Sequence, residues 1–156
     1  MSGKAIRTET GRIMELRKID DEITVAPQIT VADVSRIAEL GFKTLVANRP
    51  DHEEPGQPAM EDIERAAREH GLDWVYLPVA SGNILDSDVD AFDPMIRDAK
   101  KPVLAFCRSG TRCCVLWALS SARRKPADEL ISKARHAGYD ISGLVPRMVQ
   151  QAGKPQ

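Results

Sequence analysis

The sequence has no strong excess of charge of either sign and no long apolar run. Its 156 residues carry a formal net charge of -1 at pH 7, which gives no broad attraction to nucleic acid or to an anionic membrane surface. The segment before Ile13 mixes charged residues with Thr and Gly, so neither a secretory signal nor a membrane span is expected. We therefore expect a cytoplasmic protein that binds neither nucleic acid nor membrane, in which a local device holds any anionic ligand.

Cysteine is scarce as well. The chain has three cysteines, an odd number with two of them adjacent, which is not the pattern of a disulfide framework. In a reducing compartment they are thiols, and their surroundings decide whether they react. The three histidines lie far apart without the spacing of metal ligands, so no metal site is expected.

What is present is an alternation of predicted strands and helices. Apolar runs bounded by Gly or Pro predict buried strands over 42–47, 74–79 and 103–106. Helical spacing predicts helices over 31–40, 60–70, 87–96, 115–119, 127–137 and 144–149. The pattern predicts one α/β domain over residues 13–150, with three layers: a mainly parallel central sheet and helices on both faces.

The ends of this domain and one helix carry further expectations. Two short strands joined at Asp20-Asp21 form an opening hairpin, and residues 1–12 are expected to be a flexible N-terminal arm. Pro94 is expected to kink or shorten the helix that begins near Ser87, because proline lacks the amide hydrogen that a helix interior needs.

The residues that carry chemistry stand at the end of the most apolar strand. Before the next helix, Cys107 is followed by Arg108, Ser109, Gly110, Thr111 and Arg112. In open α/β sheets ligands bind at the carboxyl ends of strands, where helix N-termini present unpaired N–H groups. A thiolate there is stabilised by the helix dipole and by amides of the loop, which lowers its pKa below the roughly 8.5 of a free cysteine. We expect Cys107 to be the nucleophile.

Two loop residues have separate expected tasks. Gly110 allows the positive φ with which the loop turns its amides inward, and Arg112 presents a planar fork to two oxygens of an oxyanion. The ordinary reading is a buried cysteine at a strand end followed by a plain turn. A Gly three positions after the Cys, an Arg five positions after it and then a helix favour a functional site instead.

The string from Cys107 to Arg112 resembles the active loop of rhodanese-type sulfurtransferases and, with one residue fewer, that of the protein tyrosine phosphatase superfamily. Further matching strings are Arg49-Pro50-Asp51, Glu53-Glu54, Gln57-Pro58 and Pro102 to Cys107. From Ile13 to Val149 the chain resembles the phosphatase-like domain of the β-lactamase hydrolase-like proteins, a bacterial family found alone or fused to persulfide dioxygenase domains. This implies a protein tyrosine phosphatase-like fold and, for some members, a role near sulfide or persulfide metabolism.

Two features bear on the choice between sulfur and phosphoryl transfer. A loop one residue shorter than that of the tyrosine phosphatases is better matched to a cysteine persulfide. The superfamily also places a general acid, usually Asp, after the preceding strand, and the corresponding stretch 79–83 contains no carboxylate. Sulfite or a thiolate that leaves from sulfane sulfur needs no such acid. The acids that remain, by folding over the pocket, are Asp51, Glu53, Glu54 and Asp86.

We therefore expect a sulfurtransferase that moves sulfane sulfur from thiosulfate or a persulfide to a thiol acceptor through a persulfide on Cys107, with no metal or organic cofactor. The first alternative is a phosphatase-like hydrolase of phosphomonoesters through a phosphocysteine, with Arg112 on the equatorial oxygens. The second is a non-catalytic anion-binding or persulfide-binding module. The resemblance suggests a persulfide dioxygenase or another sulfide-oxidation enzyme as partner, and a homo-oligomer is left open.

The remaining candidates border the expected pocket. Cys113 stands where the superfamily usually has Ser or Thr to hydrogen bond the cysteine sulfur, and it is a candidate resolving thiol for Cys107. The rim candidates follow neighbouring strand ends and are Asn48, Arg49, Asp51, Ser81 and Asn83. Arg49 either binds the substrate or pairs with Glu53 or Glu54 to fix its loop, and the pairing is favoured.

Overall fold

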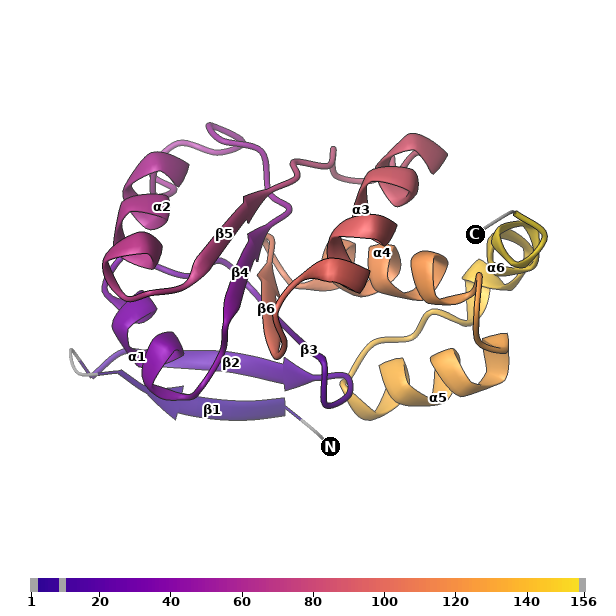
Figure 1. The fold of residues 1–156 in the computed structure, drawn as a ribbon, viewed down its shortest axis with the longest axis horizontal. Helices are drawn as coiled ribbons and strands as arrows, with labels where there is room; N and C mark the ends of the chain where they lie inside the picture. The colour runs from indigo at the N-terminus through magenta and orange to yellow at the C-terminus, as the bar shows by residue number, and fades with distance from the viewer. Residues whose placement is uncertain (1–2, 9–10, 155–156) are drawn as a thin grey trace.

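The computed structural model describes residues 3–8 and 11–154, and in this part of the chain six strands form one sheet with the order β1-β2-β3-β6-β4-β5 (Figure 1). The strands are β1 Gly3–Arg7, β2 Ile13–Lys18, β3 Ile23–Ala26, β4 Thr44–Ala47, β5 Asp73–Tyr76 and β6 Val103–Phe106. The pairings of β3 with β6, β6 with β4 and β4 with β5 are parallel, whereas β1, β2 and β3 pair antiparallel. The expected mainly parallel sheet is confirmed.

Helices cover both faces of this sheet. They are α1 Asp33–Glu39, α2 Met60–Glu69, α3 Asp86–Asp98, α4 Thr111–Ser121, α5 Ala127–His136 and α6 Val145–Ala152, with a short 3-10 turn at Ser142–Leu144. Figure 1 shows α1 and α2 on one side of the central strands and α3, α4 and α6 on the other. The expected three layers are therefore confirmed. Among the residues described, no helix is both long enough and apolar enough to cross a membrane.

Strand β6 lies in the middle of the parallel part and is buried on both faces. Leu104 and Phe106 pack in the apolar cluster under α1 and α2, whereas Val103 and Ala105 pack in the cluster under α3 and α4. Because successive side chains of a strand point to opposite faces, such a strand has to be apolar throughout. Burial of each of the larger side chains stabilises the fold by roughly 1.5–3 kcal/mol. This strand carries Cys107 to the carboxyl edge of the sheet.

The structure differs from two local expectations. Residues 3–7, expected within a flexible arm, form β1 and pair in register with residues 13–17 of β2. Backbone pairing and the packing of Ile6 against the core order this segment, whose polar composition hides the strand; residues 1–2 and 9–10 of the expected arm lie outside the described residues. Pro94 does not shorten α3, which continues to Asp98. The buried Phe92 and Ile96 on either side of Pro94 hold that helix in place.

Candidate active site

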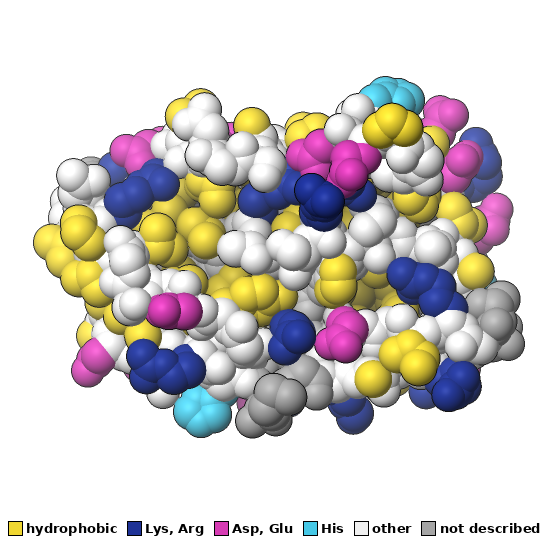
Figure 2. All heavy atoms as spheres, turned by 180° about the vertical axis from the view of Figure 1, so that it is seen from behind, with side chains coloured by type: hydrophobic (Ala, Val, Ile, Leu, Met, Phe, Trp, Pro, Cys, Tyr) yellow, Lys and Arg dark blue, Asp and Glu magenta, His cyan; other side chains and the backbone are white. Residues whose placement is uncertain are grey.

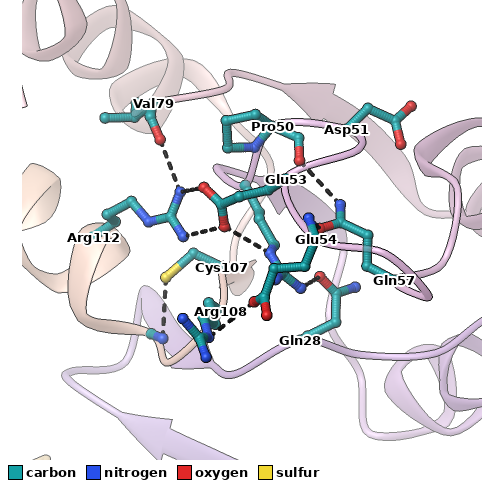
Figure 3. Close-up of polar contacts among 12 residues, drawn as sticks. Gln28, Pro50, Asp51, Glu53, Glu54, Gln57, Val79, Cys107, Arg108 and Arg112 are labelled. Carbon is teal, nitrogen blue, oxygen red and sulfur yellow. Dashed lines mark hydrogen bonds and ion pairs between the residues drawn. The ribbon is translucent and has the colours of Figure 1, made fainter. Parts of the chain in front are cut away.

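The loops that follow four parallel strands meet at one edge of the sheet (Figure 3). Gln28 follows β3, Glu53 follows β4, Val79 follows β5, and Cys107 follows β6. Because the carboxyl ends of parallel strands share an edge, residues far apart in the sequence come into contact there. Figure 3 shows the carbonyl of Val79 and the side chain of Glu53 directed toward Arg112, which lies beside Cys107. The expected loop therefore lies within a larger polar cluster.

The sulfur of Cys107 is held as a thiolate by donors of its own loop. The pKa of Cys107 falls from 9.0 to about 5, mainly because the S–H of Cys113 donates a hydrogen bond to it, with further donation from the amides of Cys113, Ser109 and Gly110 that outweighs the effect of burial. The Gly110 amide lies 3.0 Å from the sulfur. The side chain has no exposed surface. The loop therefore keeps the Cys107 sulfur ionised at neutral pH, the form in which a cysteine can act as a nucleophile.

The donors differ in part from those expected. The N–H of Thr111 donates to the hydroxyl of Ser109 over 3.4 Å and not to the sulfur, because these two side chains form a small hydrogen-bonded turn on the exposed side of the loop. Gly110 has the expected positive φ, 89°. A Cβ atom at this position would also clash with the hydroxyl of Tyr139. Both the turn and this close approach therefore require glycine at 110.

Arg112, in the first turn of α4, is bound by a carboxylate of the chain itself. Its Nη1 and Nη2 donate to the two oxygens of Glu53, each over 2.8 Å, and Nη1 also donates to the carbonyl of Val79 over 2.9 Å. Burial opposes the charge of Arg112, but these hydrogen bonds and the nearby Cys107 thiolate raise its pKa. The sequence predicts that the guanidinium of Arg112 binds two oxygens of an oxyanion. In the structure, the edge formed by Nη1 and Nη2 binds the carboxylate of Glu53.

The other edge of the Arg112 guanidinium is available. A guanidinium has five N–H donors. The contacts with Glu53 use one hydrogen of Nη1 and one of Nη2, and the contact with Val79 uses the other hydrogen of Nη1. Within residues 3–8 and 11–154, neither Nε–H nor the second hydrogen of Nη2 has a hydrogen-bond partner. Figure 3 shows the sulfur of Cys107 close to Arg112 and on the side away from Val79. Glu53 therefore orients Arg112 while two parallel donors stay open.

Glu53 and Glu54 connect the loop after β4 to three arginines. Arg49 donates through Nε to Glu53 over 2.8 Å, through Nη2 to Glu54 over 2.5 Å and through Nη1 to the side-chain oxygen of Gln28 over 3.0 Å. Nε of Arg108 lies 3.0 Å from Glu54. Arg49 thus pairs with both glutamates, which is the favoured of its two expected roles. Arg49, Arg108 and Arg112 therefore share the two carboxylates of Glu53 and Glu54.

The electrostatics of Glu53 follow from this double pairing. Hydrogen bonds from Arg112 in the first place, and from Arg49, lower the pKa of Glu53 from 4.5 to about 2 despite partial burial. A carboxyl group that is ionised at every working pH supplies no proton to a leaving group. Its role in this arrangement is to position Arg112.

Cys113 is directed toward the nucleophile from the first turn of α4. It is fully buried, and burial followed by the hydrogen bond to Cys107 raises its pKa well above 9.0. It therefore stays a thiol and donates its hydrogen to the Cys107 sulfur, the task that Ser or Thr performs in the resembling superfamily. Burial likewise raises the pKa of Cys114 to about 12, as suits a cysteine of the core.

The expected rim residues are divided between the surface and the interior. Ser81 lines a hollow beside the loop, whereas Asn83 is exposed and is not among the lining residues. Asn48 is fully buried, and its side-chain amide donates to the carbonyl of Leu77 over 2.9 Å. Because Asn48 directly continues β4, its side chain ties the loops after β4 and β5 together instead of facing a ligand.

The other expected acids are engaged in contacts of their own. Asp51 accepts the amide hydrogen of Met60 over 3.2 Å, at the start of α2. Asp86 is exposed, and its pKa is lowered by the hydrogen bond from Arg147 and by the charge of Lys154. For Asp51 and Asp86, as for Glu53, these contacts account for the position of the carboxylate, and no catalytic role is needed to explain it.

A hollow of about 540 Å³ borders the loop. Its lining residues are Ser81, Gly82, Ile84, Arg108, Ser109, Thr111, Arg112, Val115, Leu144 and Arg147. On the face drawn in Figure 2, dark blue Lys and Arg side chains mostly lie beside magenta Asp and Glu side chains. Three of the residues that line the hollow, Arg108, Arg112 and Arg147, are arginines.

Two contributors to the site were missed by the sequence analysis. Tyr139, after α5, donates its hydroxyl hydrogen to the carbonyl of Ser109 over 3.0 Å, and Arg147 of α6 reaches the hollow. Neither belongs to a loop that follows a strand, so no pattern in the sequence pointed to them. Within the residues described, no three His, Cys, Asp or Glu side chains are grouped so as to hold a metal ion.

A thiolate at the end of a buried parallel strand, beside an oriented arginine, places this chain among the cysteine-dependent phosphatase-like domains. Residues 15–124 match the family described as the β-lactamase hydrolase-like protein, phosphatase-like domain, and the chain belongs to that family. It is 37% identical over 109 residues to a β-lactamase hydrolase-like protein of Agrobacterium fabrum. That match covers 70% of this chain but only 25% of the relative, so the chain spans about a quarter of its length.

Solved structures agree with this assignment. The chain is 38% identical to a protein of Neisseria meningitidis Z2491, described provisionally as a phosphatase, with a TM-score of 0.75 over 86% of this chain and 96% of that one. The core catalytic domain of a PP-IP phosphatase of S. cerevisiae is 14% identical, with a TM-score of 0.62 over 97% of this chain and 89% of that domain. The second likeness shows the fold alone. The expected phosphatase-like fold and family are confirmed, and the comparisons support the hydrolase alternative without supporting sulfur transfer.

Proposed function

We propose that this chain hydrolyses phosphomonoesters through a phosphocysteine on Cys107. The observation that carries the proposal is the open edge of Arg112 beside a thiolate whose pKa is about 5. Two parallel N–H donors match two oxygens of a phosphoryl group. The phosphatase-like family and the 38% identical relative described as a phosphatase support the same chemistry. This revises the order expected from the sequence, in which sulfur transfer stood first.

The reaction has two displacement steps. The Cys107 thiolate attacks phosphorus, so that an S–P bond forms, the P–O bond of the ester breaks, and the leaving oxygen takes the electron pair. Arg112 holds two phosphoryl oxygens while charge is redistributed. Water then attacks phosphorus and releases inorganic phosphate, and the sulfur departs as a thiolate stabilised by the Cys113 S–H. The water proton passes to solvent, and Cys107 returns to its starting state.

Access to the sulfur requires movement at the rim. The Cys107 side chain has no exposed surface in this ligand-free conformation, whereas the neighbouring Arg108 is an exposed residue paired with Glu54. An exposed ion pair of this kind contributes only ~0.2–1 kcal/mol. A phosphoryl dianion that competes with Glu54 for Arg108 exchanges one anion for another, so opening at this point has a low energetic cost.

Sulfur transfer is the second candidate, and the length of the loop favours it. Four residues separate Cys107 from Arg112, one fewer than in the tyrosine phosphatases, which leaves less room around a phosphoryl group. The Cys107 thiolate attacks the outer sulfur of thiosulfate in that case, an S–S bond forms, and sulfite leaves with the electron pair of the broken bond. An acceptor thiolate then attacks the outer sulfur of this persulfide, so that a new S–S bond forms, the S–S bond to Cys107 breaks, and Cys107 leaves as a thiolate.

Mass spectrometry of the intact protein separates the two chemistries. After rapid acid quenching from an aryl phosphate, we expect a gain of one phosphoryl group, which Cys107→Ser abolishes and Cys114→Ser keeps. Turnover of the same phosphate is measured in parallel with thiocyanate formation from thiosulfate and cyanide. Thiocyanate formation with a gain of one sulfur atom, and no phosphate release, would replace the proposed hydrolase with the transferase.

A further inference from the structure

The hollow beside the loop contains an arginine that the proposed chemistry does not use. Arg147, near the start of α6, lines it together with Arg108 and Arg112. Nη2 of Arg147 lies 3.0 Å from a carboxylate oxygen of Asp86, at the start of α3. The Asp86 contact fixes the direction of a long side chain that otherwise loses conformational freedom on binding a ligand.

Charge pairing leaves this part of the hollow positive. Asp86 has one negative charge and faces two cations, Arg147 at 3.0 Å and Lys154 at 3.6 Å. Arg147 borders the hollow, whereas Lys154 is not among the lining residues. Lys154 also lies 4.0 Å from Asp90. Because Arg147 shares Asp86 with Lys154, the positive charge of Arg147 is only partly offset where it borders the hollow, in addition to the charge that Arg112 presents near the sulfur.

The size and walls of the hollow match a ligand larger than phosphate. Ile84, Val115 and Leu144 provide apolar lining alongside the arginines, and the volume is about 540 Å³. Sites for whole small molecules usually span roughly 300–1,000 Å³ with apolar walls and few polar groups. The hollow is lined by Arg112 but not by Cys107. With the phosphoryl group at the open edge of Arg112, the rest of the ester has room to extend into this space along the apolar wall.

We propose that Arg147 binds a second anionic group on the leaving-group portion of the substrate. The natural substrates are then phosphomonoesters whose alcohol or phenol portion carries a carboxylate or a further phosphate. This inference rests on the proposed function, because it takes the phosphoryl group to lie at Arg112. The apolar lining contacts the carbon skeleton between the two anions, and Arg108 at the rim adds attraction to either of them.

Binding to the Cys107→Ser protein, which cannot form the phosphocysteine, tests the inference without turnover. Calorimetry is run with phenyl phosphate, carboxyphenyl phosphate and phenylene bisphosphate. We expect the second anion to tighten binding by about fivefold, the upper range for a partly exposed ion pair. Arg147→Gln should lower the ratio of the affinity for each doubly anionic ligand to that for phenyl phosphate from about five to about one. Relative affinity for the carboxylate and the phosphate shows which second anion is preferred.

Lys154→Gln is the matched control, because it removes a cation from the same aspartate outside the hollow. It should keep the preference for the second anion. Arg147→Lys keeps the charge and should retain part of that preference. It provides a second test if Arg147→Gln folds poorly. Equal binding of all three ligands, or an equal loss in the Arg147 and Lys154 variants, would overturn the inference. Failure of the proposed function is seen separately, as absence of Cys107-dependent hydrolysis of phenyl phosphate by the unaltered protein.

Discussion

The hydroxyl of Tyr139 donates a hydrogen bond to the carbonyl of Ser109 over 3.0 Å, from the side of the loop opposite the nucleophile. The same peptide unit continues into the N–H of Gly110, which lies 3.0 Å from the Cys107 sulfur. In a trans peptide the C=O and N–H point in opposite directions. A bond that holds the oxygen on one side therefore aims the hydrogen on the other.

This relationship predicts the effect of Tyr139→Phe on the nucleophile. Burial raises the pKa of Tyr139, so its hydroxyl stays protonated and acts as a donor. Without this donor the peptide has more freedom, and we expect the pKa of Cys107 to rise by roughly half a unit to one unit, the scale of one hydrogen bond. The ultraviolet absorbance of the thiolate, followed against pH and corrected with Cys107→Ser, measures the shift.

Tyr76→Phe is the control for this experiment. The Tyr76 hydroxyl accepts the amide hydrogen of Asp51 over 2.8 Å, in a different loop, so its loss should leave the pKa of Cys107 in place. Phenylalanine at 139 keeps the ring that Arg17 contacts at 5.8 Å. Equal shifts of the Cys107 pKa in Tyr139→Phe and Tyr76→Phe would indicate a general loss of stability, and not the loss of the hydrogen bond that orients the Gly110 amide.

Cys113 predicts a difference between two small substitutions. Cys113→Ser keeps a hydrogen-bond donor next to the sulfur, whereas Cys113→Ala removes it. We expect the alanine variant to raise the pKa of Cys107 by about one unit and to slow breakdown of the phosphocysteine roughly tenfold, with the serine variant close to the unaltered protein. Burst and steady-state phases of aryl phosphate turnover measure the two steps, and Cys114→Ala controls for lost packing.

The pairing of Glu53 with Arg112 predicts a loss of both activity and stability in Glu53→Gln. The amide keeps the shape but leaves Arg49 and Arg112 without their shared charge. We expect kcat/KM for an aryl phosphate to fall between roughly tenfold and hundredfold, because Arg112 is no longer fixed. The free energy of unfolding in urea should fall by about 2 kcal/mol. Glu54→Gln, at the more exposed pair with Arg49 and Arg108, should cost less in both measurements.

The free energy of unfolding in acid should depend on the same carboxylate, that of Glu53. The pKa of Glu53 is about 2 in the folded protein and 4.5 without its partners. A lowered carboxyl pKa gives stability that is fully present above the unfolded value and is lost as the pH falls toward the folded one. The stability difference between the unaltered protein and Glu53→Gln should therefore be constant above pH 5 and shrink between about pH 4.5 and 2. An undiminished difference at the lowest pH would argue against the ion pair.

The pKa of Cys107, about 5, predicts where activity is lost in acid. The thiolate is the attacking form, so it is populated above this value and disappears as the pH falls through it. We expect the acid limb of kcat/KM to have its midpoint near pH 5, and the thiolate absorbance of the unaltered protein minus Cys107→Ser to titrate there as well. A midpoint above pH 8 in the absorbance would describe an ordinary thiol and remove the nucleophile.

Much of the fold follows from local patterns in the sequence. Val103–Phe106 is apolar at every position because it lies between two parallel strands, and the predicted strand has the bounds that the structure gives it. Gly110 was identifiable for a similar reason, since one residue type meets the backbone requirement of the turn. By contrast, β1 depends on pairing with β2, and its composition contains little that distinguishes a strand from a polar arm.

The site was predictable only where it follows the strands. Cys107 and Arg112 were expected together, but the partner of Arg112 was not, because Glu53 lies 59 positions earlier. The interpretation of loop length as a sign of sulfur chemistry used the residues between Cys107 and Arg112 alone. The structure shows that Glu53 fixes one edge of the Arg112 guanidinium and that the other edge is open. The family to which the chain belongs is phosphatase-like. Contacts that span the chain carry information that no local window contains.

The position of Tyr139 bears on where the working unit of this family ends. The similarity to the family ends at residue 124. The hydroxyl that supports the loop of Cys107, however, comes from Tyr139, and part of the hollow comes from Leu144 and Arg147. A fragment trimmed to residues 15–124 would retain Cys107 and Arg112 and lose the hydrogen bond from Tyr139 to the loop. In this chain, any shortened form would therefore need the stretch through α6 to keep both the support of the loop and the wall of the hollow.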